Sequence, residues 1–433
     1  MILVFAPQIT PRISYIFEWF LGEIVGIDFK LTHQREEFGR HEGPKFTYAS
    51  QALGDELHFG SYELLFESGI RLMEPEVFVH EGLPTIFKVS GVLPFDPFAA
   101  AFYLVTRYEE YLPFEPDQHG RFSAKASIAL RHGFLQMPVI EKWGDVVRQL
   151  LIQRFPGLNF RQRQYTFTPT YDVDVAWAYK HRSIGRTAGA YLKSLYMGDF
   201  NDVWQRTAVL LGRHDPYFTF DYLDDINDRY RLNPVWFFHV GRYGKLDKNI
   251  RPSHPQMRKL IERIASGAEI GVHPSYRSNR HPESVVHERK QLEAIVHHPI
   301  TKSRQHYLVM SMPETYRRLI DVGITDDYSM GYSTHLGFRA GTSLPFWFYD
   351  LAKEEKTNLR VHPFAVMDTA MQYSEAHVTP VQVPTLVEPI ILEVKSVQGK
   401  LMTIFHNNSF SEAKEWIGWR MAYEQIIEMA VVG

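Results

Sequence analysis

The alternation of apolar and polar residues predicts short strands and amphipathic helices along most of the chain. Near the N-terminus, apolar runs such as ILVF, IDFKLT and KFTYAS are typical of β-strands. A helix is predicted from Phe95 to Tyr108, where Asp96 can cap the first turn. A further helix is predicted from Ile140 to about Phe155. This first part of the chain therefore mixes strands and helices.

The pattern changes at Pro156 and Gly157, which are followed by the charged run FRQRQ and then by a new strand. We therefore expect an N-terminal α/β domain over residues 1–160 and a second domain over residues 161–433. In the second domain strand, loop and helix repeat, as in α/β folds. Its predicted helices, in chain order, are 204–211, 220–230, 257–266, 283–296, 313–323, a charged helix near Glu375, and 411 to about 431.

Two carboxylates follow the apolar strand YTFTPTY, at Asp172 and Asp174. In extended backbone, residues two apart point to the same side, so both carboxylates can face one site. Close carboxylates repel each other unless they share a cation or a proton, and the pair is therefore suited to a metal and a general base. The alternative is a helix-capping Asp beside a solvated loop Asp.

Other polar residues of chemical interest also follow short apolar runs, and α/β folds place their active sites at the carboxyl ends of strands. His273 after EIGV can bind a metal, and Arg304 can hold a carboxylate or a substrate oxygen. His406 after LMTIF can act as a general acid. Asp327 follows a further strand end, and Arg339 lies in a glycine-flanked loop. Taken singly, each of these residues also fits a packing or surface position.

Composition narrows the chemistry. The 433 residues are 45% hydrophobic and 22% charged, as in ordinary globular proteins, and 47 Lys and Arg against 50 Asp and Glu give a net charge of −3. Because there is no basic excess, a nucleic acid partner is not expected. The chain has no cysteine, so any metal must be held by Asp, Glu or some of the 20 histidines.

The N-terminus, MILVFAPQITPR, lacks the basic region and the cleavage site of a signal peptide. No stretch approaches the roughly 20 apolar residues of a membrane span. We therefore expect no membrane span and a cytoplasmic location. The sequence leaves the oligomeric state open.

The ordered series of strand-end residues resembles the polysaccharide deacetylase superfamily, which has the NodB-homology or carbohydrate esterase family four fold. The resemblance covers roughly residues 165–433, and the first part looks like the extra N-terminal domain of a divergent bacterial branch. The matching segments are, in chain order, Thr170–Asp174, His273–Arg277, Arg304–Tyr307, Asp326-Asp327 with Phe338-Arg339, and Ile404–His406.

This resemblance implies an α/β fold, a distorted (β/α) barrel, and metal-assisted removal of an N- or O-linked acetyl group from a sugar or polysaccharide precursor. It implies a divalent metal, with zinc expected and manganese or cobalt as alternatives. The roles it implies are Asp172 as general base, Asp174 and His273 as metal ligands, Arg304 as the residue that orients the base, Tyr307 as a backbone donor to the oxyanion, and His406 as general acid. Tyr276, Asp327 and Arg339 are expected to bind the substrate.

One departure from the family pattern affects the metal site. Arg277 stands where the family has its second metal histidine, and a cation repels a metal. His306 is the nearest candidate for the missing ligand, followed by His281 and His239. The alternative is an ion network without metal, in which Asp172 and Asp174 pair with Arg277 and Arg304.

Three functions therefore stay open after the sequence alone. The first is a carbohydrate deacetylase, and the second is a catalytically inactive carbohydrate-binding protein with the same fold. The third is a metal-dependent hydrolase of other C–N bonds.

Overall fold

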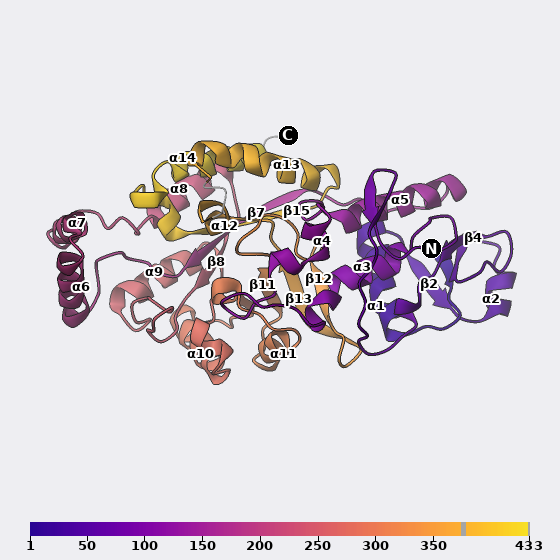
Figure 1. The fold of residues 1–433 in the computed structure, drawn as a ribbon, viewed down its shortest axis with the longest axis horizontal. Helices are drawn as coiled ribbons and strands as arrows, with labels where there is room; N and C mark the ends of the chain where they lie inside the picture. Colours follow the sequence, from indigo (N-terminus) through magenta and orange to yellow (C-terminus); the bar gives the residue numbers. More distant parts are fainter. Residues whose placement is uncertain (374–377, 432–433) are drawn as a thin grey trace.

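The computed structural model describes residues 1–373 and 378–431, which form a small parallel sheet near the N-terminus and a nine-stranded sheet in the rest of the chain (Figure 1). The predicted charged helix near Glu375 lies outside the described residues. No helix in the described ranges has the length and apolar character needed to cross a bilayer.

The N-terminal part pairs its first four strands in the order β2-β1-β3-β4, all parallel. Its elements are β1 (Ile2–Phe5), α1 (Pro11–Trp19), β2 (Phe29–Thr32), α2 (Arg35–Arg40), β3 (Lys45–Ala49), β4 (Leu57–Gly60), β5 (Phe78–His80), β6 (Leu83–Thr85), α3 (Pro97–Val105), α4 (Ile128–Arg131) and α5 (Val139–Arg154).

Helix α3 is buried over its whole length, and its start depends on Asp96 as predicted. The Asp96 carboxylate accepts hydrogen bonds from the backbone N–H groups of Phe98 and Ala99 at 2.9 and 3.0 Å. It also accepts from the hydroxyl of Tyr48 at 2.7 Å. A buried capping carboxylate therefore fixes the central helix of this domain against its sheet.

The second part contains the large sheet and the helices around it. Its elements are β7 (Thr166–Val173), α6 (Ile184–Tyr196), α7 (Phe200–Leu210), α8 (Phe220–Tyr230), β8 (Val235–Phe238), α9 (Pro255–Ala265), β9 (Glu269–Val272), α10 (Glu283–Val296), β10 (Lys302–Ser303), α11 (Glu314–Asp321), β11 (Asp326–Met330), β12 (Phe346–Asp350), β13 (Glu355–Pro363), β14 (Val366–Met367), α12 (Asp368–Gln372), α13 (Val383–Ser396), β15 (Lys400–His406) and α14 (Trp419–Val431).

The strands of the large sheet follow the order β12-β13-β11-β10-β9-β8-β7-β15-β14, with β12 antiparallel to β13 and the other pairs parallel. Within the described residues β12 and β14 each have a neighbour on one side only, so the sheet is a curled barrel that does not close. Helices α8 to α11, α13 and α14 lie around it (Figure 1). This is the distorted (β/α) barrel expected from the sequence.

The predicted helices at 220–230 and 283–296 are confirmed with the same bounds, as α8 and α10. The last helix begins later than predicted, at Trp419 instead of Ser411. The intervening residues include one short 3₁₀ turn, Lys414–Trp416, and Gly418 takes a left-handed φ of 85° directly before α14. A helix cannot run through a residue in that conformation, which explains the shorter element.

The N-terminal domain packs on the edge of the large sheet. The Tyr15 hydroxyl of α1 donates to the carbonyl of Trp347 at 2.6 Å, and the Trp19 indole donates to the carbonyl of Pro345 at 2.9 Å. Both acceptors lie in or next to edge strand β12. Helix α1 therefore covers an edge that would otherwise present unpaired backbone groups.

A buried ion network also joins the two parts. Glu110 accepts two hydrogen bonds from the guanidinium of Arg339, at 2.8 and 2.6 Å, and one from Arg107 at 2.7 Å. The side chains of all three residues are at most 3% exposed. Arg339 therefore depends on Glu110 for charge compensation away from solvent, whereas Arg107 also pairs with Glu109 at 2.8 Å.

We expect Glu110→Ala to lower the free energy of unfolding by about 3–5 kcal/mol, because the substitution leaves the buried guanidinium of Arg339 without its carboxylate partner and removes one of the two carboxylates that pair with Arg107. Urea unfolding of both proteins measures the difference. Glu36→Ala, which removes an exposed ion pair with Arg40, is the matched control and should change stability little. Equal effects of the two substitutions would contradict this account.

Candidate active site

Five of the predicted residues meet at the carboxyl ends of neighbouring parallel strands. Strand pairing puts His406 beside Asp172, the two ends of β15 and β7. The backbone N–H of His273 donates to the carbonyl at the end of β8, and that of Arg304 donates to the carbonyl at the end of β9. Asp174 follows directly after β7. The sheet register therefore brings together groups that are far apart in sequence.

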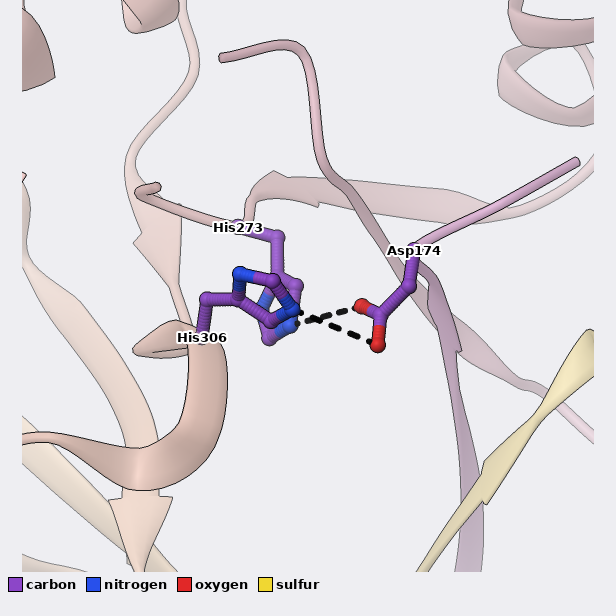
Figure 2. Close-up of side chains that lie close together, drawn as sticks. All are labelled: Asp174, His273 and His306. Carbon is purple, nitrogen blue, oxygen red and sulfur yellow. Dashed lines mark ion pairs between the residues drawn. The ribbon is translucent and has the colours of Figure 1, made fainter. Parts of the chain in front are cut away.

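Asp174, His273 and His306 form a compact group (Figure 2). Nε2 of His273 lies 3.2 Å from Oδ1 of Asp174, and Nε2 of His306 lies 3.4 Å from Oδ2. One ligand atom from each residue lies within 4.8 Å of the others. Oδ1 of Asp174 is buried and has no hydrogen-bond partner. One carboxylate, two imidazoles and this unsatisfied oxygen fit a divalent metal such as zinc.

The far side of each imidazole in this group has a fixed partner. Nδ1 of His273 donates to the carbonyl oxygen of Arg304 at 2.6 Å. Because a carbonyl only accepts, the proton of neutral His273 lies on Nδ1 and the lone pair of Nε2 faces Asp174. Nδ1 of His306 lies 3.0 Å from Oδ1 of Asp247. Both Nε2 atoms are thus held in position to bind a metal.

The charges of the group are coupled. Burial alone would raise the pKa of Asp174, but the neighbouring His306 and His273 hold it well below its usual range. Burial alone would lower the pKa of His306, whereas the carboxylates of Asp174 and Asp247 raise it to about 9. Without a metal, His306 therefore carries the proton that compensates Asp174.

Asp172 is held separately from this group by Arg304. The guanidinium Nη1 donates to Oδ1 of Asp172 at 2.8 Å and to the Thr170 hydroxyl at 2.7 Å, while Nε donates to the carbonyl of Tyr328 at 3.0 Å. Oδ2 of Asp172 lies 3.8 Å from Nε2 of His273. A fully buried arginine therefore fixes one carboxylate oxygen and leaves the other facing the group around Asp174.

His406 has a partner that the sequence did not indicate. Its Nδ1 lies 2.9 Å from Oδ1 of Asp368, and its backbone N–H donates to Oδ2 of the same residue at 2.7 Å. Nε2 of His406 lies 3.6 Å from Asp174. Burial alone would lower the pKa of His406, but Asp368 above all, with Asp174, raises it to about 10. The sequence feature that could have indicated Asp368 as a site residue is its position directly after the short strand β14.

Asp247 was also missed. It lies in the long connection between β8 and α9, away from any strand end. Besides contacting His306 it accepts the backbone N–H groups of Tyr276 and Arg277, at 2.7 and 3.1 Å. Its Oδ1 lies 3.7 Å from Nε2 of buried His239, and these residues with His306 form a second group of potential ligands.

The ion network without metal does not form as the sequence alternative supposed. Arg277 is exposed, whereas in the described part of the chain the ion pairs of Asp174 are all with histidines. Arg304 does pair with Asp172, as that alternative required. His281 lies apart from the group, about half exposed and beside Glu283.

Tyr276 and Tyr307 stand at the mouth of the site, next to His306. Their rings lie 5.5 Å apart, and the ring of Tyr307 is 4.7 Å from that of His306. His119 of the N-terminal domain contacts both tyrosines, with its Nδ1 3.3 Å from the Tyr276 hydroxyl. Arg121 donates to the Tyr307 carbonyl. The N-terminal domain therefore supplies part of the rim.

Asp327 and Arg339, both expected to bind substrate, occupy supporting positions. Asp327 is fully buried and accepts from the hydroxyl of Ser303 and the backbone N–H of Ser329, each at 2.9 Å, across the ends of β10 and β11. Arg339 is committed to the network around Glu110. The structure does not bring either side chain to the group around Asp174.

Comparison with known proteins gives one family-model match and several matches to solved structures. The profile described as "Family of unknown function (DUF7033)" matches residues 2–156, which precede β7. None of the curated proteins matches the chain.

Three solved structures match about three fifths of the chain. A putative polysaccharide deacetylase from Mycobacterium smegmatis is 14% identical, with a TM-score of 0.43, over 63% of this chain and 85% of its own. The polysaccharide deacetylase Bc1974 from Bacillus cereus is 9% identical, with a TM-score of 0.29, over 61% and 86%. A probable polysaccharide deacetylase from Pseudomonas aeruginosa PAO1 is 11% identical, with a TM-score of 0.35, over 61% and 83%.

These matches are to the kind of protein that the sequence motifs resemble. Their identities and TM-scores are low, and the function proposed below is therefore based on the side chains of the site itself.

We expect metal affinity to rise with pH. A metal must displace the proton of His306, whose pKa is raised to about 9, so binding below that pH releases a proton and strengthens by up to about tenfold per pH unit. Titration calorimetry with zinc at about pH 6 and pH 8 measures this. An affinity that is the same at both pH values would contradict the assignment of His306 as a ligand.

We also expect Asp247→Asn to weaken zinc binding by about 10–100-fold, because it removes the carboxylate that orients His306. Asp221→Asn removes an exposed carboxylate that pairs with Arg263 and is the matched control. If the two variants bind zinc equally well, Asp247 does not support the ligand.

Proposed function

We propose that this protein is a metal-dependent hydrolase that removes an N- or O-linked acetyl group from a carbohydrate or polysaccharide precursor in the cytoplasm. The observation that carries the proposal is that two carboxylates at one edge of the sheet have different neighbours. Asp174 faces three histidines, whereas Asp172 is held apart by Arg304. The motif series that resembles polysaccharide deacetylases supports the same conclusion.

In this proposal Asp174, His273 and His306 hold the divalent metal, zinc by preference, with manganese or cobalt as alternatives. When bound, such an ion polarises the acetyl carbonyl and lowers the pKa of a coordinated water. Two imidazoles and one carboxylate leave further coordination positions for water and substrate. His306 takes the place of the second histidine in the family pattern, and Arg277 stays outside the site.

Asp172 acts as the general base. Its Oδ1 is occupied by the Arg304 guanidinium, so its Oδ2 is the oxygen that can take a proton from the attacking water. Arg304 is itself fixed by Thr170 and by the carbonyl of Tyr328. The Arg304 guanidinium therefore positions the base and keeps its carboxylate ionised by placing a positive charge beside Oδ1.

His406 acts as the general acid. Its Nδ1 is hydrogen-bonded to Asp368, and its Nε2 lies 3.6 Å from Oδ2 of Asp174. Because its pKa is raised to about 10, it is protonated at neutral pH and can donate from Nε2 to the departing amine or alcohol. At the mouth Tyr307 has a left-handed φ of 58°, and its backbone N–H is the proposed donor to the oxyanion.

Metal content and acetate release test the function together. The purified protein should contain a near-stoichiometric divalent metal and release acetate from acetylated sugars. Asp174→Ala/His273→Ala should lose both metal and activity, because it removes two of the three ligands. A metal-free protein that takes up no zinc, manganese or cobalt and hydrolyses no acetylated sugar would instead support the inactive binding protein.

His406→Ala separates catalysis from metal binding. We expect it to retain metal and to lower turnover by about 10²-fold or more, as for the loss of a general acid. His281→Ala removes an exposed histidine outside the site and serves as control. Wild-type turnover in His406→Ala would show that the leaving group takes its proton elsewhere.

A further inference from the structure

A helical hairpin projects from the barrel in the connection between β7 and α8. It consists of α6 and α7 with their flanking residues, 180–213, and we call it the α6–α7 hairpin. Figure 1 shows it at the far end of the molecule from the N-terminal domain, with its two helices standing clear of the other elements. The hairpin leaves the sheet at the edge where Asp174 lies.

Helix α6 exposes an apolar stripe. Ile184, Ala188, Leu192 and Leu195 are three or four residues apart and therefore lie on one face of the helix. All four are exposed, Ile184 at 89% and Leu192 at 69%. Tyr196, at the end of the helix, is 93% exposed. An apolar face of this length is normally buried against a partner.

Helix α7 repeats the pattern. Phe200, Trp204 and Leu211 are separated by four and seven residues and lie on one face, with exposures of 69%, 56% and 83%. Of the eight tryptophans, all within the described part of the chain, Trp204 is the only exposed one. Both helices therefore present large apolar side chains to solvent.

Polar side chains, in contrast, make the contacts between the two helices. The Ser194 hydroxyl of α6 donates to Asp202 of α7 at 2.7 Å, and Arg206, on α7 itself, holds the same carboxylate at 2.6 Å. The hydroxyls of Tyr191 and Thr207 lie 2.8 Å apart. The hairpin thus turns polar groups inward and apolar groups outward, the reverse of helices that pack on their own protein.

The positive charge of the α6–α7 hairpin indicates which kind of partner covers its exposed apolar face. Residues 180–213 contain six Lys or Arg against two Asp, whereas the whole chain has a net charge of −3. Asp202 is used between the helices and Asp199 caps α7. Lys193 and Arg213 are exposed, and the Arg213 guanidinium lies 4.6 Å from the Trp204 ring centre. Exposed apolar and aromatic residues with an excess of cations are typical of segments that lie in an anionic membrane interface.

We propose that the α6–α7 hairpin docks this protein on the surface of a membrane containing anionic lipids, without crossing it. The two helices have 13 and 11 residues, too short to span a bilayer but suited to lying in the headgroup region. A second copy of this chain is a less favourable partner for the exposed face, since pairing of two hairpins brings two positively charged segments together. The proposal does not depend on the proposed hydrolase activity.

Co-sedimentation of the full chain with lipid vesicles tests this. We expect binding to vesicles of phosphatidylcholine mixed with phosphatidylglycerol, weaker binding to phosphatidylcholine alone, and a loss of the difference at high salt. Because Trp204 is the exposed tryptophan, binding should shift its fluorescence to shorter wavelength. Absence of sedimentation with either kind of vesicle at low salt would overturn the proposal.

A matched pair of variants locates the binding surface. Leu192→Ser/Trp204→Ser removes one apolar side chain from each helix and should weaken vesicle binding by about tenfold or more. Leu72→Ser/Val79→Ser removes two similarly exposed apolar side chains from the N-terminal domain, 80% and 72% exposed, and should leave binding unchanged. Circular dichroism confirms that both variants are folded.

Two further outcomes would contradict the proposal that the hairpin docks on a membrane. If the hairpin variant binds vesicles as tightly as the wild type, another surface is responsible. If the wild type binds no vesicles but self-associates, and the hairpin variant is monomeric by light scattering, the occupant is a second copy of this chain. Vesicle binding and acetate release are separate readouts, so failure of one leaves the other to be judged by its own result.

Discussion

The structure is organised around the carboxylate of Asp174, whose Oδ1 is buried without a hydrogen-bond partner and whose negative charge must be compensated by positive charge. Parallel strands bring His273, His306 and His406 around it, because the carboxyl ends of β7, β9 and β15 and the turn after β10 lie at one edge. Compensation can come from protons on the histidines or from a divalent metal. The same geometry that raises the pKa of His306 therefore prepares a metal site, and proton and metal compete for it.

The hydrogen-bond partner of each Nδ1 atom influences whether the imidazole binds a proton or a metal. His273 rests on a backbone carbonyl, which fixes its proton on Nδ1 without adding charge. His306 and His406 instead rest on carboxylates, Asp247 and Asp368, which favour the protonated imidazole. His406 lies beside Asp174 without belonging to the compact ligand group. In the proposed function it therefore remains the proton donor, whereas His306 gives up its proton on binding the metal. One type of side chain thus serves two roles through differences in its surroundings.

Much of the fold and the centre of the site could be predicted from sequence, because both depend on local patterns. Strands end in polar residues, and parallel strands bring those ends together, so the grouping of Asp172, His273 and His406 at one edge of the sheet could be predicted. Asp247 could not be found, because it lies in a long connection whose path depends on tertiary packing. The partner of Arg339 is Glu110 in the other domain, and no local pattern reveals such a pairing.

The outward apolar face of α6 is another feature that local sequence patterns do not reveal. A search for membrane segments asks for length and continuous hydrophobicity, and two short amphipathic helices have neither. Glycines at 185 and 189 further weaken the helical signal of this segment. Only the coordinates show that its apolar stripe faces solvent while polar residues fill the inside of the hairpin.

The N-terminal domain has two tasks that follow from one position. An open barrel has an exposed edge, and α1 covers that edge at β12, which fixes the domain beside the strand ends. From there the irregular segment that carries His119 and Arg121 reaches Tyr276 and Tyr307 at the mouth of the site. A loop held by a rigid scaffold is well suited to contact substrate. The domain that covers the sheet edge therefore also contributes side chains to the rim of the site.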